Sequence, residues 1–222
     1  MRSLKLALLG AGCAMALSAT ANAAVVVSAA DGPDPGPRVG ETRVITFDPA
    51  TEAGVMLSGD FSIASASVPG VTAAPLGDAT NFLTVPFDAS SGSATMDFAA
   101  FLGSRDVNGF SFYWGSIDSY NTLELLDRMG GVIATYTGPD FADPADGGQN
   151  TPATNRRVFF DLSGGDKDLG GLRFTSTSFA FESDTFSFNV VPEPATWAMM
   201  IMGFGGIGAM LRARRRQGLG AV

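Results

Sequence analysis

Apolar and polar residues alternate with a period of two over short stretches through most of the chain. Such alternation is typical of β-strands that bury one face and expose the other. Few stretches show a helical period of adequate length. The residues expected on inward strand faces are Ile45 with Phe47, Phe61 with Ile63, Ala94 with Met96 and Phe98, Val158 with Phe160 and Leu162, Leu172 with Phe174, Phe179 with Phe181, and Phe186 with Phe188 and Val190.

These short strands are separated by Gly, Asp, Ser and Pro, and the chain contains 17 phenylalanines. This pattern predicts an all-β fold, an antiparallel, jelly-roll-like β-sandwich of about ten strands in two sheets around an aromatic core. Leu123 and Leu125 alternate before residues 127–131, and a second alternation follows, which predicts a hairpin with a five-residue loop. Residues 30–37 are rich in turn formers and are expected to be an exposed, irregular leader.

The N-terminus has the pattern of a secretory signal peptide over residues 1–23. Basic residues precede an apolar stretch at residues 6–17, and Ala21 and Ala23 form an Ala-x-Ala cleavage site. We therefore expect export through the secretion machinery and removal of residues 1–23 by signal peptidase. A lipoprotein interpretation would use Cys13, but Gly10 stands where such a signal needs an aliphatic residue.

Composition excludes several classes of chemistry from the exported region. The chain has no histidine, and its single cysteine lies in the signal peptide. Disulfides, zinc sites of Cys or His, and Ser-His or Cys-His catalysis are therefore excluded. Residues 24–191 carry 8 Lys and Arg against 21 Asp and Glu, a net charge near −13. A region with this charge repels nucleic acid and attracts cations.

The C-terminal region combines an uncharged segment, at about residues 195–211, with the arginines that follow it. As a helix the segment would be about 25 Å long, slightly short of the roughly 30 Å hydrocarbon core of a bilayer. The basic end would stay in the cytoplasm, with Trp197 at the outer interface. Pro192 and Pro194 flank Glu193 and keep the preceding chain extended and accessible. The basic residues are Arg212, Arg214, Arg215 and Arg216.

The segment VPEPATWAMMIMGFGGIGAMLRARRR resembles the PEP-CTERM sorting signal in its PEPxxWA form. The resemblance implies an exosortase as partner, which would cut near Pro192, Glu193 and Pro194 and release or transfer the preceding domain. The chain then divides into a signal peptide (1–23), a β-sandwich surface domain (24–191), a sorting signal with a transmembrane helix (192–216) and a cytoplasmic tail (217–222). The alternative is a permanent C-terminal membrane anchor without processing.

These signals together predict a protein that is exported, held transiently in the inner membrane, and then placed on the cell surface or in the extracellular matrix. The expected role is structural or adhesive, in exopolysaccharide or biofilm. A carbohydrate-binding, lectin-like module is the alternative. An enzyme is not expected, because no two carboxylates can be paired from sequence in the way that a glycoside hydrolase requires.

The stretch from Phe110 to Asn121 contains the candidate glycan-binding residues. Trp114 and Tyr120 offer flat faces for sugar rings, while Asp118 and Asn121 offer hydrogen bonds to hydroxyl groups. The plainer interpretation, which the sequence favours, places Trp114 in the core and uses Asp118 and Asn121 to cap a turn.

A long loop over residues 138–155 contains the candidate metal ligands Asp140, Asp143 and Asp146. Carboxylates suit calcium, but their spacing does not match an EF-hand and no Glu closes the site. Solvated surface charge is the favoured interpretation. No cofactor is expected apart from this calcium alternative.

Overall fold

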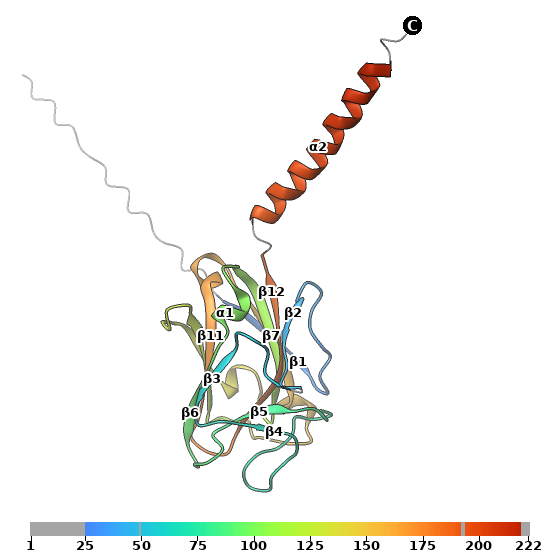
Figure 1. The fold of residues 1–222 in the computed structure, drawn as a ribbon. Coiled ribbons are helices and arrows are strands. Elements are labelled where there is room, and N and C mark those ends of the chain that lie inside the picture. Colours follow the sequence, from blue (N-terminus) through green and yellow to red (C-terminus); the bar gives the residue numbers. More distant parts are fainter. Residues whose placement is uncertain (1–24, 49, 192–193, 219–222) are drawn as a thin grey trace, which may run out of the picture.

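Two antiparallel sheets face each other across an aromatic core in this computed structural model (Figure 1). The structure describes residues 25–48, 50–191 and 194–218. Its strands confirm the expected antiparallel, jelly-roll-like β-sandwich, with twelve strands in these residues rather than about ten. The signal peptide, with Ala21 and Ala23, lies outside the described residues, as do Pro192 and Glu193.

The larger sheet has seven strands in the order β1-β10-β7-β12-β5-β4, and β2 pairs separately with β12. Strands β7 and β12 lie at its centre, and their antiparallel pairing breaks register between Asp184 and Ser187. The strand bounds are β1 Val26–Asp31, β2 Arg43–Ile45, β4 Ser62–Ala64, β5 Phe82–Val85, β7 Val107–Gly115, β10 Arg156–Asp161 and β12 Phe181–Val190.

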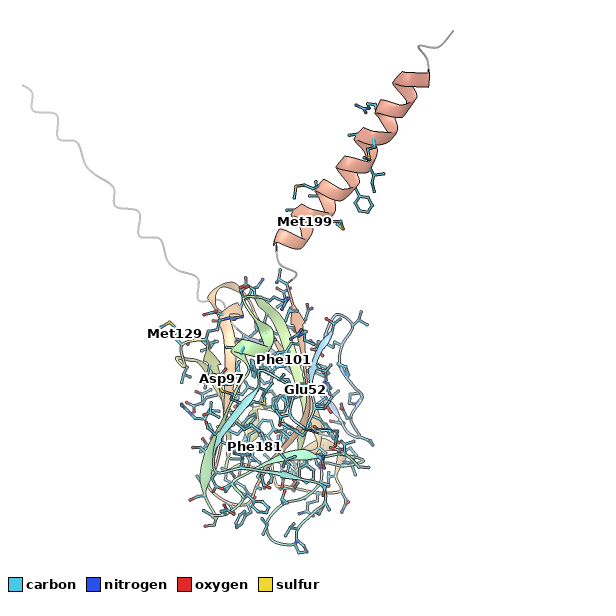
Figure 2. The ribbon with its side chains drawn as sticks, in the orientation of Figure 1. Glu52, Asp97, Phe101, Met129, Phe181 and Met199 are labelled. Carbon is cyan, nitrogen blue, oxygen red and sulfur yellow. The ribbon has the colours of Figure 1, made fainter. Side chains whose placement is uncertain are left out.

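The smaller sheet has five strands in the order β3-β6-β11-β8-β9. The predicted hairpin is β8 and β9, with Leu123 opposite Tyr136 and Leu125 opposite Ala134. Strand β8 includes Asp127, so the connection is residues 128–131, one residue shorter than expected, with Met129 exposed at the turn (Figure 2). The strand bounds are β3 Met56–Gly59, β6 Gly92–Asp97, β8 Asn121–Asp127, β9 Val132–Thr137 and β11 Leu169–Ser176.

Helical segments are few within the sandwich region. They are the short helix α1 Ala99–Leu102 and the 3-10 turns η1 Gly138–Asp140, η2 Pro152–Thr154 and η3 Gly164–Asp168. The predicted long loop therefore lies between β9 and β10 and contains η1 and η2.

The C-terminal helix α2 covers Pro194–Gly218, and its side chains from Ala198 to Met210 are exposed. Within the described part of the chain, no helix combines the length and the apolarity needed to cross a bilayer. The structure therefore confirms the helix expected at about residues 195–211, but not its role as a membrane span.

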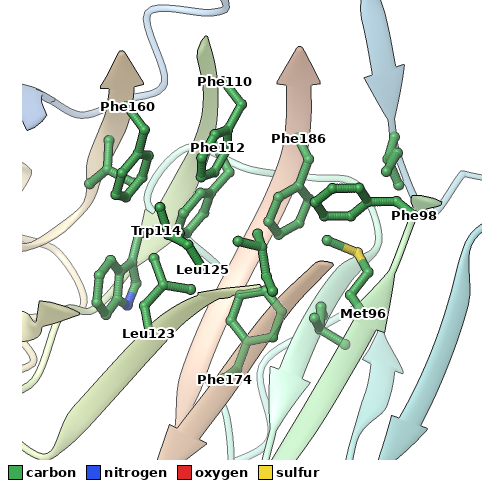
Figure 3. Packing of buried hydrophobic residues seen from close by; sticks show 14 of the residues in the cluster. Met96, Phe98, Phe110, Phe112, Trp114, Leu123, Leu125, Phe160, Phe174 and Phe186 are labelled. Carbon is green, nitrogen blue, oxygen red and sulfur yellow. The ribbon is translucent and has the colours of Figure 1, made fainter. Parts of the chain in front are cut away.

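Phenylalanine rings fill the space between the sheets, as the alternation predicts (Figure 3). Phe112 stacks on Phe186 with ring centroids 4.9 Å apart, and Phe110 stacks on Phe160 at 4.5 Å. Offset and edge-to-face pairs of this kind stabilise a core beyond the area that they bury. One predicted position is wrong: Phe179 does not share a strand face with Phe181, because β12 begins only at Phe181 and Phe179 lies in the bend before it.

The outer face of the larger sheet is also covered, although its residues are polar. Strand β7 is buried on both faces from Gly109 to Gly115. Tyr113 donates a hydrogen bond of 2.7 Å to the carbonyl of Leu76, in the connection between β4 and β5. A Cβ at Gly115 would lie 2.8 Å from Cγ of Pro75 in the same connection. This long connection therefore packs closely on β7, and only glycine permits its approach at position 115.

Candidate functional site

A polar cavity of about 540 Å³ lies where β7 leaves the sheet and β12 enters it. Four segments form its wall: residues 67–73, residues 116–120, residues 146–149 and residues 178–182. Its volume falls in the usual range for small-molecule sites, which is about 300–1,000 Å³. The acidic side chains among its lining residues are Asp118, Asp146 and Glu182, and no Lys or Arg is among them.

Glu182, on β12, is buried at the base of this cavity and is fully hydrogen-bonded. Its Oε1 accepts bonds from the backbone N–H of Ala73 at 2.9 Å and from the hydroxyl of Thr72 at 3.3 Å. Its Oε2 accepts a bond of 2.8 Å from the hydroxyl of Ser116. Burial raises the pKa of Glu182 from 4.5 to about 8, against the opposing effect of these donors, and the charge of Asp118 raises it further. Glu182, in the segment of residues 178–182, therefore links this segment to residues 67–73 and to residues 116–120.

Ser116 turns the chain out of β7 and towards the cavity. Its φ of +36° is uncommon for a residue with a side chain. Two contacts hold it there: its backbone N–H donates to Oδ1 of Asn155 at 3.1 Å, and its hydroxyl donates to Glu182. The turn brings Asp118 and Tyr120 to the cavity wall.

Asp118 and Asp146 lie directly opposite each other across an isolated antiparallel bridge. Ser119 donates to the carbonyl of Ala145 at 3.0 Å and Gly147 donates to that of Ile117 at 3.1 Å. Bonds in this pattern flank the pair and make it the narrow, non-hydrogen-bonded type, in which the Cα atoms are about 4.5 Å apart and the side chains are closest. Two like charges in such a pair repel each other.

The environment of Asp118 reflects this arrangement. Burial raises the pKa of Asp118, the nearby hydroxyl of Tyr120 lowers it, and the charge of Asp146 raises it. A Cβ at Gly147 would lie 2.4 Å from Oδ1 of Asp118, so a side chain at position 147 would displace the carboxylate. Tyr120 donates a bond of 2.6 Å to the carbonyl of Phe179, which fixes its ring on the cavity wall.

The structure divides the four candidate glycan-binding residues. Asp118 and Tyr120 line the cavity, as a binding role requires. Trp114 lies among the buried rings of the core (Figure 3) and is 0% exposed. It stacks on Phe181 with centroids 4.2 Å apart, so the sugar-stacking role considered for Trp114 is wrong. Asn121 is also buried, where its amide donates to the carbonyl of Ala180 at 3.1 Å. Strand alternation points Trp114 inward, because its neighbour Tyr113 faces the outer layer.

The candidate calcium ligands do not come together. Asp140 accepts bonds from the backbone N–H of Thr137 at 2.6 Å and from its hydroxyl at 3.0 Å, which caps η1. Asp146 lines the cavity and Asp143 does not. Among the described residues, no group of three or more acidic side chains is arranged to hold a metal ion.

Sequence reasoning did not identify Glu182 as a site residue. In the sequence, Glu182 occupies a position of the last strand that alternation assigns to the solvent. Acids are common at such positions, so Glu182 does not stand out. The grouping of Asp118, Asp146 and Glu182 depends on the loop pairing at 117–119 and 145–147. Periodicity contains no information about that pairing.

The architecture is thus that of an antiparallel β-sandwich with a polar cavity at one end. The chain also carries a PEP-CTERM protein-sorting motif, because the family model of that motif matches residues 190–216. This match confirms the resemblance of the tail and covers Pro192, Glu193, Pro194, Trp197 and the four arginines. The motif implies that the chain is exported and held at the membrane for sorting, with an exosortase as the processing partner.

Solved structures with partial likeness include two carbohydrate-binding modules. One is a low-affinity xylan-binding module, CBM86, from Roseburia intestinalis, with 14% identity over 67% of this chain and 94% of that chain at a TM-score of 0.38. Another is the module CsCBM6-3 from Clostridium stercorarium, solved with cellobiose, with 15% identity over 59% and 92% of the two chains at a TM-score of 0.31.

A third likeness is to the enzymatically active domain of tailspike protein 4 of bacteriophage CBA120. Its identity is 15%, over 63% of this chain and 19% of that chain, at a TM-score of 0.32. A comparison with curated proteins finds no match. The ligands and activities of these three proteins are their own and do not identify a ligand for this chain.

Proposed function

We propose that this chain is an exported surface protein that an exosortase processes at its C-terminus, and that its sandwich domain has a structural or adhesive role in an extracellular polysaccharide matrix. The sorting motif at residues 190–216 is the observation that carries the proposal. The acidic, histidine-free domain in front of the motif suits an extracellular location, because high net charge favours solubility.

In this proposal the secretion machinery exports the chain and signal peptidase removes residues 1–23. Helix α2 then holds the protein at the inner membrane for a limited time. Its uncharged segment is short, so it would need a thin or locally thinned bilayer. Arg212 and the arginines after it keep the C-terminus in the cytoplasm, which leaves Glu193 and the sandwich on the outer side.

The proposal excludes a permanent anchor, which would also place the sandwich outside the membrane. Deletion of the cognate exosortase distinguishes a sorting signal from a permanent anchor. If the tail is a sorting signal, cells without the exosortase retain the protein in the membrane fraction at its uncut mass, whereas wild-type cells release or transfer it. An unchanged mass and location after the deletion would contradict the proposal.

A Glu193→Ala variant in wild-type cells provides a matched test on the substrate side. It should accumulate uncut, as in the deletion strain, because the motif centres on this residue. An Asp143→Ala variant changes the same charge on the exposed loop of the sandwich and should be processed normally.

A further inference from the structure

The cavity at the end of the sandwich has the features of a ligand site rather than of a packing defect. Its volume is about 540 Å³, and the buried Glu182 joins its own wall segment to two others through hydrogen bonds with Thr72, Ala73 and Ser116. Because these hydrogen bonds hold three separate segments together at the floor of the cavity, the cavity keeps one shape. Preorganised cavities lose less conformational entropy when they bind a ligand.

The charges on the wall favour a cationic group. Asp118 and Asp146 form a narrow antiparallel pair, and no Lys or Arg is among the residues that line the cavity. A positive group between these two carboxylates would remove their mutual repulsion and gain charge-assisted hydrogen bonds. The same carboxylates would repel an anionic ligand.

The arrangement fits an organic cation better than a metal ion. Calcium takes six to eight oxygen ligands, and no group of three or more acids among the described residues is placed to hold a metal. An alkylammonium group needs only acceptors for its three N–H bonds. Two carboxylates and a backbone carbonyl or hydroxyl supply these.

The rest of the lining fits a polyhydroxylated ring. Ser67, Gln149 and Ser178 bring polar groups to the wall, and Val68 and Phe179 bring apolar surface. Sites that combine an apolar face with a few convergent polar groups are typical of small-molecule recognition. The ring of Tyr120, which its bond to the carbonyl of Phe179 holds in place, adds a flat surface of the kind that packs against sugars.

We infer that this cavity binds an amine-bearing sugar unit, with its ammonium group between Asp118 and Asp146 and its ring against Tyr120. The choice of a polymer as the source of that unit rests on the proposed function, since a matrix protein meets polysaccharide. The binding chemistry itself is independent of how the tail is processed.

Isothermal titration calorimetry on the purified full-length chain tests the inference at about pH 6, where a primary amine is protonated. About 0.15 M salt weakens the non-specific attraction of cations to the acidic surface. The probes are a glucosamine hexamer, its fully N-acetylated form, a glucose hexamer of the same linkage, and spermidine. We expect the glucosamine hexamer to bind and the other three to bind at least tenfold more weakly.

Charge-removing variants locate the site. Asp118→Asn and Asp146→Asn should each weaken glucosamine binding by about tenfold or more, which corresponds to about 1.4 kcal/mol. Asp143→Asn, in the same loop but not in the cavity wall, should bind as the wild type does. Asp143 and Asp146 are both exposed, so neither substitution removes a core side chain, and the two variants change the charge equally.

Three results would overturn the inference. They are an absence of binding by the glucosamine hexamer, equal binding by the N-acetylated or glucose hexamer, and equal binding by spermidine. The last would mean general attraction of cations without recognition of a sugar. None of these results would affect exosortase processing, so failure here is distinct from failure of the proposed function.

Discussion

Arg157 forms an ion pair of 2.8 Å with Asp34, although Arg157 is 0% exposed and the two residues are 123 positions apart. The same guanidinium donates to the hydroxyls of Ser111 and Ser187, each at 3.0 Å. The segment around Asp34 therefore lies over the centre of the larger sheet, and the buried positive charge has a partner. Residues 30–37, which were expected to form an exposed leader, are therefore part of the folded structure.

Removal of Arg157 should destabilise the domain strongly. Arg157→Ala removes the buried guanidinium that bonds Asp34, Ser111 and Ser187, and each hydrogen bond to a charged group contributes about 1.5–3 kcal/mol. Arg38→Ala is the control, because Arg38 pairs with Asp161 at 3.2 Å and donates to Ser28, but the side chains of the pair are 43% and 60% exposed. That pair should contribute less than about 1 kcal/mol. Urea unfolding measures both, and equal losses would contradict the role given to Arg157.

The buried acid Glu182 should make stability fall as pH rises. Because burial raises its pKa from 4.5 to about 8, the folded state binds a proton that the unfolded state has lost between these values. The contribution of Glu182 to the free energy of unfolding is therefore fully present below about pH 4.5 and is lost as pH rises to about 8. Asp184, whose pKa burial raises to about 6, acts in the same direction over a lower range.

A Glu182→Gln variant isolates the contribution of this residue. Its amide can accept from Ala73 and donate to Ser116, and it does not ionise. The variant should match the wild type near pH 5 and exceed it near pH 9 by an amount on the order of 4 kcal/mol. Chemical unfolding at both pH values checks this, and parallel profiles for the two proteins would show that Glu182 is not the buried acid responsible.

Trp114 should matter for stability and not for ligand binding. Trp114→Ala removes a side chain that stacks on Phe181 and Phe112, and such a truncation costs about 3–5 kcal/mol. Trp114→Phe keeps an aromatic ring in the core and removes an indole N–H that has no hydrogen-bond partner among the described residues. The Phe variant should bind the glucosamine hexamer as the wild type does in calorimetry. A folded Trp114→Phe protein that no longer binds would return this residue to the ligand site.

Period-two alternation accounts for the sandwich, its core and the hairpin of β8 and β9. Leu123 and Leu125 are buried where their alternation places them, because one sheet face must pack on the other. Alternation does not predict that the opposite face is also covered. Ser111 and Arg157 are expected to face solvent, yet both are buried, and the connection between β1 and β2 covers them through Glu41 and Asp34.

The cavity illustrates the same limit. Asp118 and Tyr120 could be chosen from sequence because polar and aromatic residues follow each other in one turn. Their partners Asp146 and Glu182 come from a distant loop and from the last strand of the sandwich. The backbone bonds between residues 117–119 and 145–147, together with the bonds from Thr72 and Ala73 to Glu182, bring them to one place.

The intact mass of the protein recovered from the cell surface or the medium tests the central claim most directly. If an exosortase recognises the motif at residues 190–216, the recovered chain ends near Pro192, Glu193 or Pro194, with or without an added group, and lacks α2 and the arginines. The same chain recovered from cells without the exosortase retains α2 and the arginines. A surface or secreted protein that retains α2 in wild-type cells would contradict the account.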